Sequence, residues 1–106
     1  MPNKRQIYAN STEYADITVT GDHDLSLDTI EIFIASSRVR SLPADTVWLN
    51  PDRISHPTTD QVRAELLVGP EGGTLTLAPG QYRVWAKLTD SPEVPWLRSA
   101  DILVIV

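Results

Sequence analysis

Hydrophobic and polar residues alternate with a period of two in several short segments of the chain. Residues 13–20 (EYADITVT) place Ala15, Ile17 and Val19 on one side, and residues 29–36 (TIEIFIAS) repeat the pattern with isoleucine at every second position. Successive side chains of a β-strand point to opposite faces, so this period is typical of a strand with one buried face. We therefore predict strands over both segments.

The second half of the chain contains two more segments of this kind. Residues 61–69 (QVRAELLVG) also suit a helix capped by Asp60, but the period of two, the short length and the turn-forming run GPEGG at 69–73 favour a strand. In residues 81–89 the apolar residues occupy the even positions, which predicts a core-facing side. Trp85 falls on the opposite, polar side of this strand, and its place there needs an explanation.

Three weaker segments complete the pattern: an edge strand over 46–49, a short strand over 74–80 with its leucines inward, and a final strand within 98–106. About seven strands at spacings of roughly ten residues, without a convincing helix, are typical of a β-sandwich. We predict an all-β fold, an immunoglobulin-like antiparallel β-sandwich over residues 13–106, preceded by an N-terminal arm over residues 1–12.

The run L-x-P-G-x-Y at residues 77–82 supports this fold class. It contains Pro79, Gly80 and Tyr82, and a tyrosine just inside a strand after such a turn matches the tyrosine corner of immunoglobulin-like sandwiches. We expect the phenol to bond back to the backbone of the turn. The cysteine pair and core tryptophan of antibody domains are missing, so the comparison is with the wider immunoglobulin-like class.

Composition narrows the classes of function. The chain has 106 residues and a net charge of -5, with its basic residues scattered from Lys4 to Arg98, so we expect one domain and no nucleic-acid partner. It contains no cysteine, which removes disulfides and thiolate metal sites. No stretch has the length of a signal peptide's apolar region or a membrane span, so we expect a protein made in a cytosol without a membrane partner.

Two polar segments offer candidate chemistry. GDHDLSLD at 21–28 supplies Asp22, His23, Asp24 and Asp28, from which a cation site could be drawn, but a solvated turn explains the same residues and no further glutamate closes a coordination shell. We predict no metal and no cofactor, and leave open whether Asp22, Asp24 and Asp28 bind a cation.

A second polar segment, at 53–60, holds Ser55, His56 and Asp60. Neighbours in one loop rarely align as nucleophile, base and orienting acid, and no G-x-S-x-G elbow or glycine-rich oxyanion loop accompanies them. We therefore expect no catalytic residue and no enzymatic activity.

Apolar residues on outer faces are the remaining unusual feature. Phe33 and Trp85 fall on polar sides, and the last strand is apolar on both, so whichever set of its residues enters the core leaves the other outside. We take Leu103 and Ile105 as the candidates that lie beside Trp85 and contact a partner, and leave open which face of this strand is buried. Two interpretations stay open: contact with a partner, or cover by the N-terminal arm. The enrichment of tryptophan at interface hot spots favours a partner. Trp96, in the proline-rich SPEVPWL, either presents a contact point or folds down to cap the core.

Residues 8–25, 62–95 and 100–106 resemble a family of small proteins encoded among the virion genes of tailed bacteriophages, especially those of actinobacteria. The D-I-T-V-T and D-L-x-x-x-T-I-E-I patterns at 16–20 and 24–32 are also similar to the N-terminal immunoglobulin-like domain of siphophage baseplate upper proteins. These are strand and turn patterns, not catalytic signatures.

The resemblance implies a non-enzymatic structural component of a virion, assembled in the bacterial host cytoplasm. Its expected partners are capsid, head-to-tail connector or tail proteins, or further copies of itself. The chain stops after one domain, which favours an accessory or decoration role. Two alternatives remain: a carbohydrate-binding or adhesion module that uses Trp48, Trp85 or Trp96 for stacking, and a phage-encoded regulator that binds a host protein.

Overall fold

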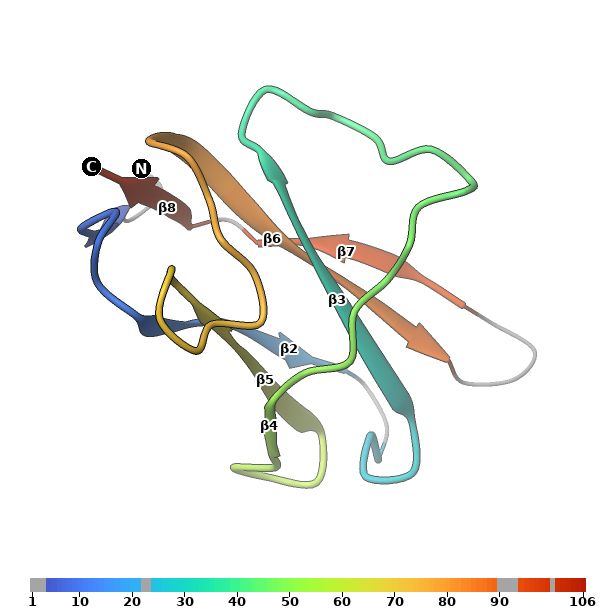
Figure 1. The fold of residues 1–106 in the computed structure, drawn as a ribbon. Coiled ribbons are helices and arrows are strands. Elements are labelled where there is room, and N and C mark those ends of the chain that lie inside the picture. The colour runs from blue at the N-terminus through green and yellow to red at the C-terminus, as the bar shows by residue number, and fades with distance from the viewer. Residues whose placement is uncertain (1–3, 22–23, 90–93, 100) are drawn as a thin grey trace.

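The chain forms two packed β-sheets in a computed structural model that describes residues 4–21, 24–89, 94–99 and 101–106 (Figure 1). Eight strands lie within these residues: β1 (Lys4–Ile7), β2 (Glu13–Thr20), β3 (Thr29–Ser36), β4 (Arg53–Ser55), β5 (Gln61–Val68), β6 (Gly80–Thr89), β7 (Trp96–Arg98) and β8 (Ile102–Ile105). The larger sheet has the order β1-β8-β6-β3, with β7 also on β6, and the smaller sheet has the order β2-β5-β4. The fold is an immunoglobulin-like β-sandwich, as predicted.

The long strands pair antiparallel in the registers that bring their apolar positions together. In the larger sheet Ile32 of β3 lies opposite Ala86 of β6, and in the smaller sheet Ile17 of β2 lies opposite Ala64 of β5. All four residues are buried. A shift of one residue would turn each apolar set toward solvent, so burial of one face holds these registers.

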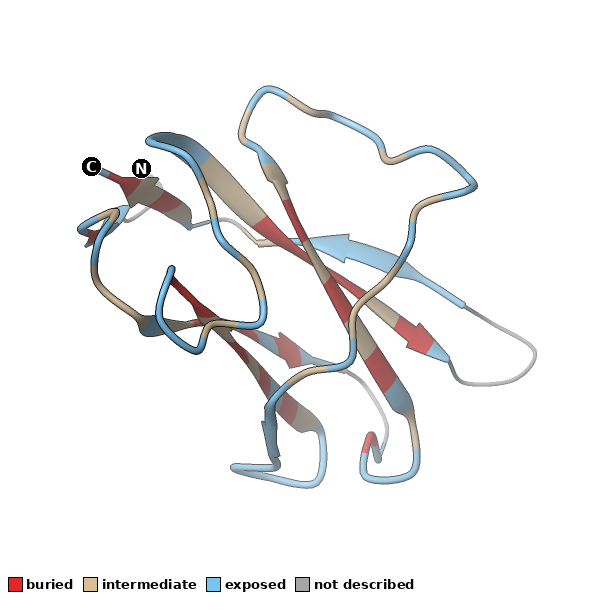
Figure 2. Cartoon of the chain, in the orientation of Figure 1, coloured by how far each residue is buried: buried red, intermediate tan, exposed pale blue. Residues whose placement is uncertain are grey.

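Buried positions recur at every second residue along β2 and β5 (Figure 2). The core lies between the two sheets. It also takes Ile7 from β1 and Leu25 from the turn before β3, and Leu75 and Leu77 pack against it. The core-facing side of β6, predicted from its even positions, is confirmed.

Leu103 and Ile105 belong to this core, with exposures of 5% and 3%. Their assignment to an outer, partner-facing side was therefore wrong. Leu103 lies opposite Tyr82, and Ile105 lies opposite Gly80, so β8 has the same core-facing side as this part of β6. Neither residue is beside Trp85 on the outer face, and neither is accessible to a partner.

The two ends of the predicted pattern differ from expectation. Residues 4–7 of the expected arm form a strand that pairs parallel with β8, which makes them an edge strand of the larger sheet. The expected final strand is divided into β7 and β8. Residues 74–80 form no strand apart from the start of β6, and contribute one bridge between Leu75 and Val68.

The tyrosine corner is present. The Tyr82 hydroxyl donates a hydrogen bond of 2.6 Å to the backbone carbonyl of Ala78, in the turn that contains Pro79 and leads into Gly80. The corner ties the segment after β5 to the beginning of β6.

Candidate binding face

The outer face of the larger sheet collects aromatic side chains from three separate segments. Phe33 of β3 lies directly opposite Trp85 of β6, so these two residues are neighbours on the outer face, as expected from the sequence. The ring centroids of Phe33 and Trp48 are 6.4 Å apart, and those of Trp48 and Trp96 are 5.2 Å apart, both with edge-to-face geometry. We call Phe33, Trp48 and Trp96 the aromatic patch.

Trp48 reaches this face because the long loop between β3 and β4 returns along the edge of β3. Ile32 and Leu49 exchange two backbone hydrogen bonds of 2.8 Å. The edge strand predicted over 46–49 is thus reduced to an isolated bridge at Leu49. Leu49 packs against the core. Since neighbouring side chains on extended backbone point to opposite sides, Trp48 lies on the outer side.

Trp85 is only 6% exposed, so the expectation that it contributes an exposed contact surface was wrong. The Arg98 guanidinium lies over the indole, 5.7 Å from the ring centroid, and donates a hydrogen bond of 3.3 Å to the carbonyl of Val39 in the β3–β4 loop. Trp85 is thus covered by its own chain, through β7 and this loop rather than through the N-terminal arm.

Trp96 is the accessible member of the aromatic patch. It is 37% exposed, and Val94 beside it is 46% exposed. It lies opposite Lys87 in the pairing of β6 with β7 and is absent from the core cluster, so of its two interpretations the structure favours a contact point over a core cap. Residues 90–93, the first part of the proline-rich segment, lie outside the described residues.

The Lys87 side chain borders the aromatic patch. The Lys87 ammonium lies 5.4 Å from the Trp48 ring centroid and 3.3 Å from a carboxylate oxygen of Glu31. This arrangement holds Lys87 across the patch and combines a cation–π contact with an ion pair. The patch therefore offers apolar ring surface next to a charged, hydrogen-bonding edge.

The outer face of the smaller sheet is different, since its charges neutralise one another. Asp16 pairs with Arg63 at 3.2 Å and with Arg5 at 3.4 Å, and Arg53 pairs with Glu65 at 2.8 Å. The hydrogen bond from Arg53 lowers the pKa of Glu65 and raises the pKa of Arg53. These pairs are typical of a solvated face.

The two polar segments do not assemble a recognisable centre. His56 Nδ1 lies 3.2 Å from the carbonyl of Gln61, and Asp60 accepts a hydrogen bond from Thr58. Asp24 accepts one from the Ser26 amide at 2.8 Å, which closes the turn. Asp22 and His23 lie outside the described residues, and the described residues hold no group of three or more His, Cys, Asp or Glu side chains placed for a metal ion.

Comparison with known protein families, with curated proteins and with solved structures found no match for this chain. In the part of the chain that the structure describes, no helix has the length and apolar character needed to cross a membrane. The surface itself is therefore the basis for a functional proposal. Its main feature, the aromatic patch, includes Trp48, which sequence reasoning considered only for carbohydrate stacking. The signal that could have placed Trp48 there was its alternation with Leu49 in the predicted edge strand.

Proposed function

We propose that the chain is a non-enzymatic structural component of a tailed-phage virion, which docks on a head, connector or tail protein through the aromatic patch. The observation that supports docking is the exposed Trp96 ring, held against Trp48 at 5.2 Å. The assignment to a virion rests on the resemblance of the strand and turn patterns.

The patch has the physical properties of an interface hot spot. Tryptophan carries much of the binding energy at interfaces because one ring buries a large area with few rotatable bonds. Trp96 follows Pro95, whose ring restricts the backbone before it, and its contact with Trp48 limits the ring further. A partner would therefore spend little conformational entropy in ordering Trp96.

Trp96→Ala tests the docking face. The variant should fold but incorporate poorly into particles, because truncation of a central hot-spot residue typically costs about 2 kcal/mol or more of binding. Leu27→Ala is the matched control, since Leu27 is 93% exposed, lies in the turn before β3 and is not a member of the patch. Quantitative mass spectrometry of purified virions gives the incorporation. Absence of the wild-type chain from virions, or equal incorporation of both variants, contradicts the proposal.

Carbohydrate binding is a second candidate, supported by the same exposed ring. A sugar would stack on Trp96 beside the Lys87 ammonium. Titration of the isolated chain with a glycan array, read by tryptophan fluorescence, separates the two functions. Saturable glycan binding that Trp96→Ala abolishes favours the carbohydrate-binding module.

A further inference from the structure

One edge of β2 carries no strand in the described part of the chain, because the smaller sheet has the order β2-β5-β4. The direction in which the backbone N–H and C=O groups of β2 point can be inferred from the hydrogen bonds of its neighbour β5. The Leu67 amide donates to Asp52 at 2.7 Å, and the Glu65 carbonyl accepts from the Asp52 amide at 2.8 Å, so both groups point away from β2. In the pairing of β2 with β5, Tyr14 lies opposite Leu67 and Asp16 lies opposite Glu65.

Backbone groups alternate in direction along an antiparallel pair. The N–H and C=O groups of Tyr14, Asp16, Thr18 and Thr20 therefore point to the open edge of β2. The Gly21 amide, one residue further, donates to Asp60 at 2.8 Å, which agrees with this alternation. The edge is thus a row of backbone donors and acceptors with the spacing that a further strand requires.

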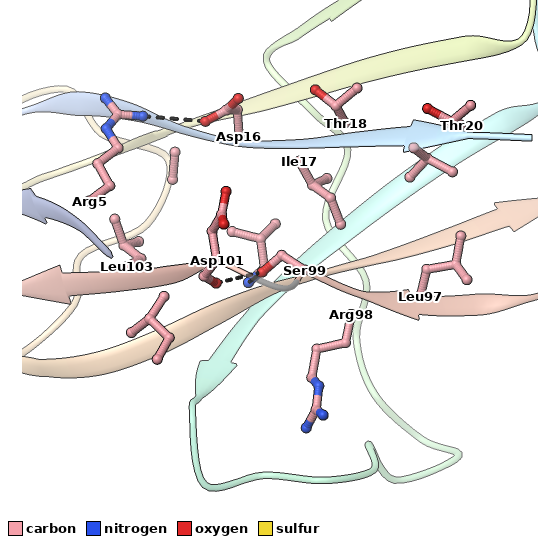
Figure 3. Close-up of a pocket in the computed structure, with 14 residues that line it drawn as sticks. Arg5, Asp16, Ile17, Thr18, Thr20, Leu97, Arg98, Ser99, Asp101 and Leu103 are labelled. Carbon is pink, nitrogen blue, oxygen red and sulfur yellow. Dashed lines mark hydrogen bonds and ion pairs between the residues drawn. The ribbon is translucent and has the colours of Figure 1, made fainter. Parts of the chain in front are cut away.

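A groove of about 450 Å³ runs beside this edge, between β2 and the segment from β7 to β8 (Figure 3). The core residues Ile17, Val84 and Leu103 line it, so its apolar wall is continuous with the interior of the sandwich. The side chains of Thr18 and Thr20 point away from the groove in Figure 3, whereas Ile17 points toward it.

A bulge between β7 and β8 forms the opposite wall. Trp85 pairs with Arg98, and Tyr82 pairs with Leu103. An advance of three residues along β6 therefore corresponds to five residues along the segment from β7 to β8. Ser99 holds the bulge: its hydroxyl accepts from the Val84 amide at 3.1 Å and donates to the carbonyl of Asp101 at 3.0 Å.

The charge of the groove is set by Asp101. Its carboxylate points toward β2 (Figure 3). Asp101 is exposed and forms no ion pair among the described residues. The nearby cations are engaged elsewhere, since Arg5 pairs with Asp16 and Arg98 lies over Trp85. The groove therefore suits a basic residue.

We propose that this groove binds an extended peptide strand of a partner protein. The strand pairs with the open edge of β2, directs alternate apolar side chains into the groove and places a lysine or arginine near Asp101. This is strand addition at a sheet edge, in which the backbone supplies affinity and the groove supplies selectivity. The site is separate from the aromatic patch, so the proposal stands independently of the proposed virion role.

A second copy of the chain fits the groove less well. If two β2 edges met, each strand would keep its apolar side chains in its own core, and neither groove would be filled. Self-association through β2 is consequently an outcome that would overturn the proposal.

The test uses the whole chain and two capped ten-residue peptides of alternating valine and threonine, one with lysine and one with glutamate at a central valine position, which faces the groove and Asp101. Amide chemical shifts of the chain report where each peptide binds at millimolar concentration. We expect changes at residues 14–20, 97–99 and 101–103, and tighter binding of the lysine peptide. Thr18→Pro removes an outward N–H, whereas the matched Thr18→Ala keeps it. The proline variant should bind at least about fivefold more weakly than the alanine variant.

Asp101→Lys provides a second variant that leaves the edge of β2 intact. It should reverse the preference, so that the glutamate peptide binds more tightly than the lysine peptide. Any of three results overturns the proposal: no shift changes at 14–20 with either peptide, equal affinities of the proline and alanine variants when both are folded, or a peptide preference that Asp101→Lys leaves unchanged. Dimerisation of the free chain through β2, seen by analytical ultracentrifugation, also overturns it.

Discussion

Trp85→Ala should destabilise the fold strongly, although the residue is on the outer face of its sheet. The ring is 6% exposed. Burial of about 200 Å² of aromatic surface at about 25 cal/mol per Å² corresponds to about 5 kcal/mol, and measured truncations of buried tryptophan cost about 3–5 kcal/mol. A domain of this size has about 5–15 kcal/mol in total, so the variant should lose a large part of its stability.

Guanidinium chloride denaturation followed by circular dichroism measures the loss. Trp85→Phe should cost less than Trp85→Ala, since it keeps a ring under Arg98 and removes an indole N–H that is buried without a hydrogen bond in the described residues. Trp96→Ala is the exposed comparison and should cost about 1 kcal/mol, the value of its edge contact. If Trp85→Ala lost no more stability than Trp96→Ala, the inference that the chain covers its own tryptophan would fail.

Three further predictions concern other parts of the sandwich. Tyr82→Phe should lose about 0.5–1.5 kcal/mol through its corner hydrogen bond, measured by urea denaturation; no loss would mean that the bond contributes nothing net. Gly69→Ala should lose about 3 kcal/mol or more of folding stability, because the new Cβ would collide with neighbouring backbone at a φ of +149°. Gly72→Ala, whose Cβ would face open space, should lose about 1 kcal/mol, and equal shifts of the two melting temperatures would contradict this. Arg53 lowers the pKa of Glu65, so the ion pair stabilises the fold at pH values above the ordinary pKa of glutamate, and this stability is lost as the pH falls through the lowered pKa. Glu65→Gln should therefore be less stable than wild type at neutral pH but not in strong acid. A difference in stability that persists in acid would contradict the ion pair as its cause.

The long strands could be predicted from sequence because each buries one face. The period of two gave residues 13–20 and 29–36 with the bounds that the structure shows for β2 and β3. The tyrosine corner was predictable for a similar reason, since its turn and its tyrosine are neighbours in the chain. Local patterns determine local geometry when both partners lie within a few residues.

The surface could not be predicted in the same way, because it depends on contacts between distant segments. Alternation correctly placed Trp85 opposite the core-facing side of β6, but could not show that Arg98 and the loop around Val39 cover it. The apolar residues on both sides of β8 left its orientation ambiguous, and the bulge at Ser99 changed which residues face inward. A period read along one strand carries no information about an insertion relative to its neighbour.

The parallel pairing of β1 with β8 has a mechanical consequence. Lys4 lies opposite Ile102 and Ile7 opposite Ile105, and the pairing continues in hydrogen bonds between Ala9, Ile7 and Val106. Tension applied at Lys4 and at Val106 would pull these two strands past each other along their length. Their hydrogen bonds run across the strands, so they would bear the load together in shear rather than open one after another. The pair would act as a clamp that resists extension of the chain until it ruptures as a unit.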